Sequence, residues 1–265
     1  MSGLDDRWAA GSAYEDYMGR WSRALAARFV AWLGVRPGAH WLDVGCGTGA
    51  MTVAICAAAD PASVTGCDPS AAFVEYAREH SRDPRASFVV AGAGSLPSRV
   101  GGFDTVTSSL VLNFIPDTVT AVREMATRCV AGGTVSACVW DYSEGMQFLR
   151  KLFDAAVALD DAARAHDEGL RFPLCRPEPL NDAFRRAGLA DVCCEPIEIP
   201  TTFAGFDDFW RPFLAGTGPA PSYVVALPAD RRAALAQLLE RTLPRAAGGA
   251  IELTARAWAV RGTVG

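Results

Sequence analysis

The stretch from Asp43 to Gly49 carries the residues whose types and spacing indicate ligand binding. Three glycines, Gly45, Gly47 and Gly49, stand at alternate positions between an apolar run and a helical pattern that starts at Ala50. Glycine has no Cβ, so it accepts positive φ angles and lets a ligand approach the backbone closely. The first N–H groups of the helix would face the same ligand. The stretch therefore predicts a strand, a tight ligand-gripping turn and a helix.

Two acidic residues narrow the chemistry of that ligand. Asp43 comes directly before the glycines, where a carboxylate would repel the pyrophosphate of a dinucleotide. Asp68 closes the next apolar run, at the distance expected of a group that holds ribose hydroxyls. The glycines with Ala50 also satisfy a loose dinucleotide pattern. The two acids together nevertheless indicate a nucleoside that carries no pyrophosphate.

The elements that position these residues follow from the alternation of apolar runs and helical patterns. The predicted strands are residues 40–44, 63–67, 86–90 and 103–108, and a run that ends at Trp140 after a turn at Gly132-Gly133. The predicted helices start at Ala50, span 71–79 with Ser70 as the cap, and span 118–129. This order is typical of an α/β fold with a doubly wound parallel sheet, which binds ligands at the carboxyl ends of its strands.

Four sequence blocks in this order resemble the class I S-adenosylmethionine-dependent methyltransferases, in particular the type 11 family. The blocks are LDVGCGTG at 42–49, GCDPS at 66–70, GSLP at 94–97 and FDTVTSSLVLNFIPD at 103–117. The resemblance implies a mostly parallel, seven-stranded Rossmann-like sheet with an antiparallel last strand. It also implies S-adenosyl-L-methionine as the cofactor and methyl transfer as the reaction.

The resemblance assigns residues to the cofactor. An N-terminal aromatic segment with Tyr14, Tyr17 and Arg20 would close over the methyl donor, and the basic residue would meet the carboxylate of the cofactor. The alternative is a helix that packs on the edge of the sheet. The expected cofactor-binding residues are Tyr17, Arg20, Asp43, Gly45, Cys46, Gly47, Gly49, Asp68, Pro69, Gly92, Ala93, Ser109 and Leu110.

Ala93 departs from the family pattern. Relatives usually carry an acidic residue after the glycine that corresponds to Gly92, where it accepts a hydrogen bond from the adenine amino group. The loss of one charge-assisted hydrogen bond costs about 1.5 to 3 kcal/mol. We expect a neighbouring backbone group or Ser95 to replace this contact.

Two residues are candidates for catalysis. A sulfonium methyl group is already activated, so the enzyme must mainly align the acceptor and exclude water, and a general base is optional. His166 would accept a proton near neutral pH, and Asp141 or Glu144 would do so less readily. Asn113 stands where the family often has a histidine. The alternatives are a surface position for His166 and ordinary turn chemistry before Pro116 for Asn113.

The predicted organisation is one α/β core with two elaborations. Residues 1–140 would form the cofactor-binding core with its N-terminal helical cap. Residues 141–180 would form a helical lid insertion, where relatives cover the acceptor. Residues 181–265 would supply the last strands, with a second helical elaboration at 204–243. Apolar helical stripes at 146–159 and 231–243 and an alternating run at 251–260 support this division.

Composition excludes several classes of partner. The formal net charge of the 265-residue chain is −5, and no run of Lys or Arg offers the basic footprint that nucleic acid requires. No apolar stretch approaches the length of a membrane span, and the N-terminus does not resemble a signal peptide. We expect a cytoplasmic protein that acts on a small-molecule acceptor, with no membrane partner. The oligomeric state does not follow from the sequence.

The eight cysteines suggest one alternative, and Ala93 suggests another. Cys175, Cys193 and Cys194 would bind a thiophilic metalloid as the methyl acceptor. Adjacent cysteines in an alternating strand face opposite ways, however, so they make a poor joint site. Without a C-x-x-C pair, reduced and mostly buried thiols are expected, and no resident metal. The second alternative is a protein that binds S-adenosylmethionine without transferring its methyl group.

Overall fold

The computed structural model describes residues 15–265, so Tyr14 of the predicted cap lies outside the described part of the chain. The chain divides into two compact units. The sheet unit comprises residues 21–139, 174–197 and 257–265. The helical unit comprises residues 140–173, 198–256 and the described residues up to Arg20. The division at residues 140 and 180 that the sequence suggested stays a prediction.

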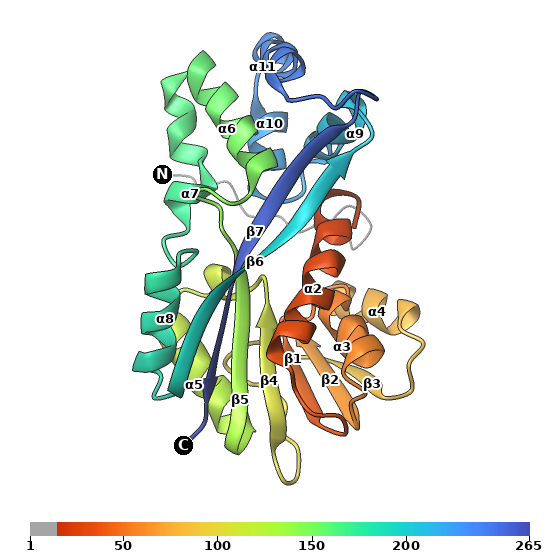
Figure 1. Ribbon diagram of the computed structural model, residues 1–265, viewed down its shortest axis with the longest axis vertical. Helices are drawn as coiled ribbons and strands as arrows, with labels where there is room; N and C mark the ends of the chain where they lie inside the picture. Colours follow the sequence, from red (N-terminus) through yellow and green to blue (C-terminus); the bar gives the residue numbers. More distant parts are fainter. Residues whose placement is uncertain (1–14) are drawn as a thin grey trace. The chain divides into compact units, whose positions relative to one another are not determined.

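The sheet has seven strands in the order β3-β2-β1-β4-β5-β7-β6 (Figure 1). The strands are β1 (His40–Val44), β2 (Ser63–Asp68), β3 (Ala86–Val90), β4 (Phe103–Ser109), β5 (Cys129–Trp140), β6 (Ala190–Phe203) and β7 (Ile251–Thr263). The first five strands pair in parallel. β7 runs antiparallel to β5, since the N–H of Gly132 donates to Val264 O and the N–H of Val264 donates to Gly133 O. The predicted doubly wound sheet with an antiparallel last strand is therefore confirmed.

Helices of the sheet unit connect its parallel strands. They are α3 (Ala50–Ala58), α4 (Ala71–His80), the short η2 (Leu112–Phe114), α5 (Thr118–Arg128) and α8 (Pro177–Arg186), with α2 (Arg20–Leu33) ahead of them. Ser70 caps α4, as predicted, by accepting a hydrogen bond from the Phe73 N–H. β1 lies at the centre of this parallel array with Trp41 to Val44 all buried. Parallel strands that are buried on both faces are continuous apolar runs, and these runs predicted the positions of the strands in the sequence.

The Gly132-Gly133 pair does not form the predicted turn before β5. The strand starts earlier, at Cys129, and its register with β4 shifts between the pairs Phe103–Cys129 and Thr105–Thr134. Gly132 has a φ of +73°, and a Cβ on Gly133 would lie 2.8 Å from Asp104 O. The glycines therefore allow an irregularity inside a continuing strand, which is a common role of glycine in sheets.

The helical unit contains short helices packed around aromatic side chains. Its helices are η1 (Glu15–Gly19), α6 (Gln147–Leu159), η3 (Asp161–His166), α7 (Glu168–Arg171), α9 (Phe206–Trp210), η4 (Arg211–Ala215), α10 (Pro219–Ala226) and α11 (Ala229–Thr242). The predicted apolar stripe at 146–159 forms α6. The chain after His166 forms α7, because the Asp167 side chain accepts from the Gly169 N–H and starts a helical turn.

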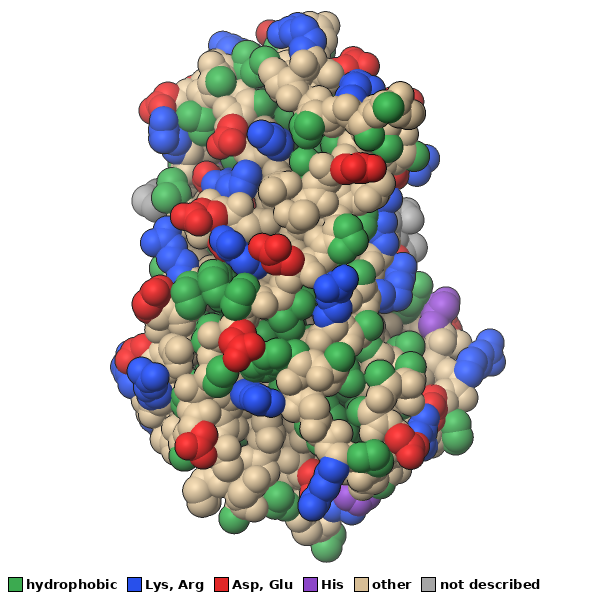
Figure 2. Space-filling view, viewed as in Figure 1, with side chains coloured by type: hydrophobic (Ala, Val, Ile, Leu, Met, Phe, Trp, Pro, Cys, Tyr) green, Lys and Arg blue, Asp and Glu red, His purple; other side chains and the backbone are tan. Residues whose placement is uncertain are grey.

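Two surface properties bear on partners. None of the helices in residues 15–265 is both long and apolar enough to cross a bilayer. On the face drawn in Figure 2, the side chains of Lys and Arg are interspersed with those of Asp and Glu. That face therefore carries no extended basic patch of the kind that binds nucleic acid.

Candidate functional site

The three glycines between β1 and α3 adopt the backbone conformation that the sequence predicts for a tight turn. Gly45, Gly47 and Gly49 have φ angles of +73°, +51° and +92°, a region that other residues enter at a cost of about 1 to 2 kcal/mol. The N–H groups of Gly45 and Cys46 donate to Cys67 O at 2.7 and 2.9 Å. The turn is thereby held against the end of β2.

The same glycines differ in what surrounds them. A Cβ on Gly45 would lie 2.5 Å from Val111 Cγ2, so this glycine is required by packing. A Cβ on Gly49 would make ordinary contacts with Ala77 and Phe88 at 3.4 to 3.5 Å. A Cβ on Gly47 would meet nothing within 4 Å. Gly47 therefore faces open space, where a ligand can approach the backbone.

Asp68 links the end of β2 to the tip of the glycine turn. Its Oδ2 accepts a hydrogen bond from the Gly47 N–H at 3.1 Å, and its Oδ1 accepts one from the Ser70 N–H at 2.8 Å. Burial raises the pKa of Asp68, whereas the bonds from Ser70 and Gly47 oppose the rise. The structure thus brings Asp68 and Gly47 together. The ribose contact expected of Asp68 stays a prediction.

Asp43 is fully buried near the end of β1, and only one of its two carboxylate oxygens accepts a hydrogen bond from a described residue. Its Oδ2 accepts a hydrogen bond from Thr52 Oγ1 at 2.7 Å, whereas its Oδ1 has no hydrogen-bond partner among the described residues. Burial raises the pKa of Asp43, the hydrogen bonds of Thr52 lower it and the charge of Asp68 raises it, with a net result of about 7. A cationic ligand group fits such a carboxylate, since it would supply the missing partner.

Thr52 is a residue that sequence reasoning missed. It lies fully buried in the first turn of α3, and its hydroxyl is the donor to Asp43. The available signal was a polar residue at the third position of a helix whose N-cap is glycine, since a glycine cap leaves the first N–H groups without a side-chain acceptor.

The remaining predicted cofactor-binding residues lie in the chain after β3 and β4, and their contacts with the cofactor stay a prediction. A Cβ on Gly92 would meet only Pro69 Cβ, at 3.7 Å, and the Ser95 N–H donates to Gly92 O to close a turn around Ala93. Leu110 has a φ of +64°, which is unusual for a residue with a side chain. Its N–H donates to Cys138 O at 2.8 Å, so the chain bends sharply after Ser109. Strained backbone of this kind often marks a ligand site.

Asn113 lies in η2, shortly after this bend. Its Nδ2 atom is buried and has no hydrogen-bond partner among residues 15–265. A buried amide without a partner costs free energy, so an unaccounted ligand or water is expected to accept from it. Of the two interpretations of Asn113, this observation favours the site residue over the turn residue.

Tyr17 and Arg20 lie in the helical unit. Tyr17 is buried with its ring edge-on to Phe213, at a centroid distance of 5.7 Å. Arg20 pairs with Asp208 at 3.1 Å and lies over the ring of Phe203, with its guanidinium carbon 4.8 Å from the ring centre. These contacts give both residues a packing role. Their cap over the cofactor stays a prediction.

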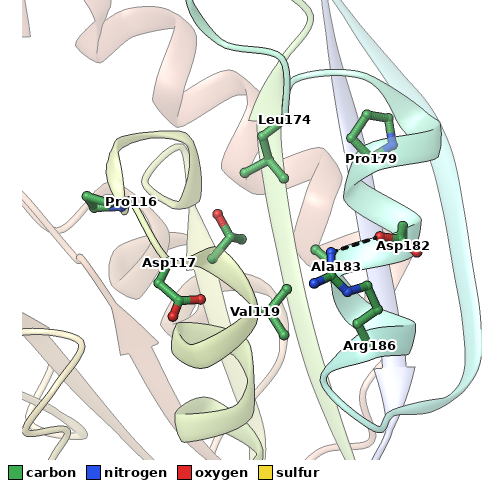
Figure 3. Close-up of a pocket in the computed structure, with 9 residues that line it drawn as sticks. Pro116, Asp117, Val119, Leu174, Pro179, Asp182, Ala183 and Arg186 are labelled. Atoms are coloured by element: carbon green, nitrogen blue, oxygen red, sulfur yellow. Dashed lines mark hydrogen bonds and ion pairs between the residues drawn. The ribbon is translucent and has the colours of Figure 1, made fainter.

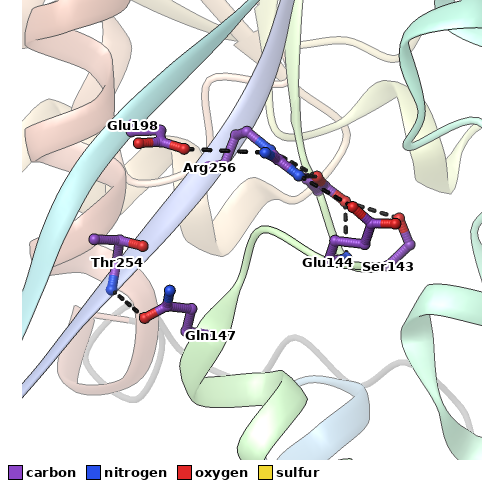
Figure 4. A network of polar contacts seen from close by, with 7 residues as sticks. Ser143, Glu144, Gln147, Glu198, Thr254 and Arg256 are labelled. Carbon is purple, nitrogen blue, oxygen red and sulfur yellow. Dashed lines mark hydrogen bonds and ion pairs between the residues drawn. The ribbon is translucent and has the colours of Figure 1, made fainter.

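The candidate bases of the helical unit also have structural partners. His166 ends η3 and its ring lies 5.0 Å from that of Tyr223. Burial opposes ionisation of Asp141, but hydrogen bonds from Arg256, Ser143 and the Glu144 N–H prevail and lower the pKa of Asp141. The Asp141 Oδ2 atom lies 2.6 Å from Nη2 of Arg256, a residue of β7, and Figure 4 shows Arg256 among the residues of this polar network. A carboxylate with a lowered pKa is a weak base near neutral pH.

A groove of about 380 Å³ lies between α5 and α8 of the sheet unit (Figure 3). It is lined by side chains that include Pro116, Asp117, Pro179 and Arg186, and it contains none of the predicted cofactor-binding residues. Arg186 in its wall pairs with Asp182 of the same helix at 3.4 Å. The charged side chains that line the groove thus have partners within the protein: Arg186 pairs with Asp182, and Asp117 accepts from Thr120.

The cysteines do not assemble a site for soft metals. Within the described chain, no three His, Cys, Asp or Glu side chains are placed to hold a metal ion together. The Cys193 thiol donates to Glu195 Oε1 at 3.3 Å, and burial raises the pKa of Cys194 to about 12. A neutral thiol is a poor ligand, so the metalloid alternative gains no support.

The match to a family model covers the glycine turn after β1 and extends from within β1 to within β5. The type 11 family model, described as a methyltransferase domain, matches residues 42–137. A demethylmenaquinone methyltransferase of Staphylococcus aureus is 38% identical over 105 residues, which are 39% of this chain and 44% of that enzyme. The chain thus matches less than half of the length of this relative.

Solved structures share the fold over most of the chain. A chain of the Haloferax volcanii complex that contains the Trm112 methyltransferase activator has a TM-score of 0.58 and 21% identity, and the match covers 100% of this chain and 99% of that chain. Phosphoethanolamine N-methyltransferase 2 of Haemonchus contortus, solved with S-adenosyl-L-methionine, has a TM-score of 0.57 and 17% identity over 95% of this chain and 56% of that chain. The prediction of a type 11 methyltransferase domain is confirmed for residues 42–137, and these structures confirm the fold. Residues 42–137 of this chain are thus similar to the methyltransferase domain of the type 11 family.

Proposed function

We propose that this chain transfers the methyl group of S-adenosyl-L-methionine to a small-molecule acceptor. The observation that carries the proposal is the spare Oδ1 atom of Asp43, fully buried beside a glycine turn. S-adenosylmethionine carries an ammonium group and a sulfonium group, and either cation would favour the ionised form of this carboxylate. Gly47, which faces open space in the same turn, leaves room for the cofactor.

Further contacts with the cofactor are proposed for Asp68, for the chain after β3 and β4, and for two residues of the helical unit. Each Asp68 oxygen accepts one hydrogen bond from the backbone and keeps a further lone pair for a ribose hydroxyl. The bend at Ser109 and Leu110 and the turn at Gly92 and Ala93 present backbone groups. The proposed cofactor-binding residues are Tyr17, Arg20, Asp43, Gly45, Cys46, Gly47, Gly49, Asp68, Pro69, Gly92, Ala93, Ser109 and Leu110.

The chemistry asks little of the protein beyond orientation. The bound cofactor supplies an electrophilic methyl group on its sulfonium. The protein must hold the acceptor atom in line with that group and exclude water, which can lower a barrier by about 7 to 11 kcal/mol in ideal cases. The Nδ2 atom of Asn113, buried without a partner in the described structure, is proposed to orient the acceptor or the cofactor by donating a hydrogen bond. His166 is the proposed base for acceptors that must lose a proton.

Charge and family similarity limit the acceptor to a class. The net charge of −5 and the mixed charges of the surface in Figure 2 favour a small molecule over nucleic acid. The names of the two related methyltransferases specify demethylmenaquinone and phosphoethanolamine, which differ greatly in polarity. The family match ends at residue 137 and leaves out the helical unit. The acceptor atom, oxygen, nitrogen, carbon or sulfur, is therefore left to experiment.

Two measurements test the proposal in sequence. Calorimetry with S-adenosylmethionine and S-adenosylhomocysteine should show binding by the wild type and a loss of affinity in Asp43→Ala and Asp68→Ala. Asp60→Asn is the matched control, since Asp60 is an exposed carboxylate paired with Arg85. Absence of binding by the wild type would contradict the proposal.

Release of S-adenosylhomocysteine in the presence of a panel of small-molecule acceptors tests the transfer itself. Turnover with any acceptor class supports methyl transfer and identifies the acceptor. Tight cofactor binding without turnover across the panel would favour the alternative of a protein that binds S-adenosylmethionine or uses its sulfonium without methylating.

A further inference from the structure

Helix α3 begins without a capping side chain of its own. Its N-cap is Gly49, which supplies no side-chain hydrogen bond, although the first N–H groups of a helix need acceptors. Asp43, from the end of β1, takes this role for Thr52, the third residue of the helix. Asp43 Oδ2 accepts from Thr52 Oγ1 at 2.7 Å, and the backbone N–H of Thr52 also stabilises the carboxylate. One oxygen of Asp43 is thus committed to the helix.

We propose that Thr52 is a positioning residue of the cofactor site, which fixes Oδ2 of Asp43 so that Oδ1 is the oxygen offered to the cationic part of the cofactor. This inference rests on the proposed function. A threonine hydroxyl has one proton to donate, so its bond to Oδ2 distinguishes the two oxygens. Both side chains are completely buried, so no solvent molecule is available to replace the hydroxyl if it is removed.

The neighbours of Asp43 on the sheet do not take over this task. Thr107 of β4 is its partner in the ladder of β1 and β4. Thr107 Oγ1, however, accepts a hydrogen bond from Ser136 Oγ at 3.1 Å, so this pair is directed toward β5. Within the described residues, Thr52 is therefore the side chain hydrogen-bonded to Asp43.

The titratable groups whose charges interact with Asp43 are Asp68, Cys46, Cys67 and Cys138. Burial raises the pKa of Cys67 and that of Cys138 to about 12, and it raises the pKa of Cys46 even further. These thiols stay neutral between about pH 4 and 8. The proton that Asp43 releases when a cation binds should therefore be visible in the pH dependence of cofactor affinity.

The test compares Thr52→Val, which keeps the shape of the side chain and removes the donor, with Thr52→Ser, which keeps the donor. Calorimetric titration with S-adenosylhomocysteine and S-adenosylmethionine from about pH 5 to 8 should show affinity rising with pH. We expect Thr52→Val to weaken binding about tenfold near pH 7 and to move the midpoint of the pH dependence up by about one unit. Thr52→Ser should restore both. Thr105→Val is the matched control, because Thr105 is a buried threonine of β4 outside the Asp43 contacts.

A double-variant cycle separates positioning from a general loss of structure. In an Asp43→Asn background, Thr52→Val should have almost no further effect on affinity, whereas additive losses would overturn the inference. If Thr52→Val does not fold, Thr52→Ala replaces it in the same cycle. A wild type that binds neither cofactor contradicts the proposed function. A wild type that binds, together with a Thr52→Val protein of unchanged affinity and unchanged midpoint, contradicts only the role of Thr52.

Discussion

The end of β1 and the helical unit differ in how the aspartate side chains described above are partnered. At the ends of β1 and β4, Asp43 Oδ1 and Asn113 Nδ2 are buried without partners among the described residues. In the helical unit, Arg20 pairs with Asp208, Arg256 with Asp141 and Arg150 with Asp167. Buried polar groups are normally satisfied. The comparison therefore supports the proposed ligand contact of Asp43 and a structural role for the ion pairs.

The largest expected effect concerns the buried charge of Asp43. Its pKa is raised to about 7 from 3.8, so between these values the folded protein binds a proton that the unfolded chain has lost. The free energy of unfolding should therefore fall as pH rises, by about 3 kcal/mol from pH 5 to 8, and level off above about pH 7. Urea denaturation of the cofactor-free protein measures this slope. Asp43→Asn should reduce this slope. An unchanged slope in the variant would contradict the claim that the buried Asp43 carboxyl causes the pH dependence.

The second prediction separates two glycines of the same turn. Gly45→Ala should lower the free energy of unfolding by about 2 to 3 kcal/mol, because its Cβ would overlap Val111 and its φ is positive. Gly47→Ala should cost only about 1 kcal/mol, since its surroundings are open, but it should weaken cofactor binding. Denaturation and calorimetry on both variants check this. Val111→Ala in the Gly45→Ala background should recover part of the stability, and a failure to do so would argue against the overlap.

The third prediction concerns the ion pair between Arg256 and Asp141, part of the network in Figure 4. Arg256→Gln should lower the free energy of unfolding at pH 7 by about 2 kcal/mol, a value reduced from that of a fully buried pair because Arg256 is partly exposed. Since the pKa of Asp141 is lowered, its stabilising contribution is present above about pH 4 and is lost as pH falls below that range. Glu198→Gln is the control, because Glu198 lies 4.0 Å from Arg256 and is largely exposed. Equal effects of the two variants would contradict the assignment.

The smallest expected effect sharpens the role of Arg20. Arg20→Gln and Asp208→Asn each remove the same half-buried ion pair, so each should cost less than about 1 kcal/mol of stability. If Arg20 also caps the cofactor, the two variants should differ in cofactor affinity, because only Arg20→Gln removes the cation that would pair with the cofactor carboxylate. We expect calorimetry to show affinity about threefold lower in Arg20→Gln and unchanged in Asp208→Asn. Equal affinities in the two variants would leave Arg20 with its packing role alone.

Local patterns were sufficient to predict the first four strands and the glycine turn. β1 and β3 have the predicted ends, and β2 and β4 each extend one residue beyond the prediction. Buried parallel strands are short apolar runs, and positive φ angles select glycine. Both signals lie within a few residues of sequence. The prediction of β5 was less accurate, because the pairing with β4 carries the strand through two glycines that locally indicate a turn.

The contacts that define the roles of side chains were not predictable in this way. Arg20 and Asp208 are separated by 188 positions and Asp141 and Arg256 by 115, so no periodicity in the sequence connects them. His166 was selected by residue type, and its contact with Tyr223 arises from packing between η3 and α10. Asp43 was selected as a carboxylate next to the glycines, and the structure shows it completely buried near the end of β1. That only one of its oxygens is committed to Thr52 could be learned only from the structure.

The start of α3 has a consequence for the order in which the molecule folds. Most helices carry their own capping residue and can form their first turn early, from local sequence alone. α3 has glycine at this position and receives its acceptor from β1. Its first turn can therefore complete its hydrogen bonds only after the strand and the glycine turn are in place. We expect this turn to be unformed in the folding transition state, so that Thr52→Val, which removes the hydroxyl donor, should accelerate unfolding far more than it slows folding.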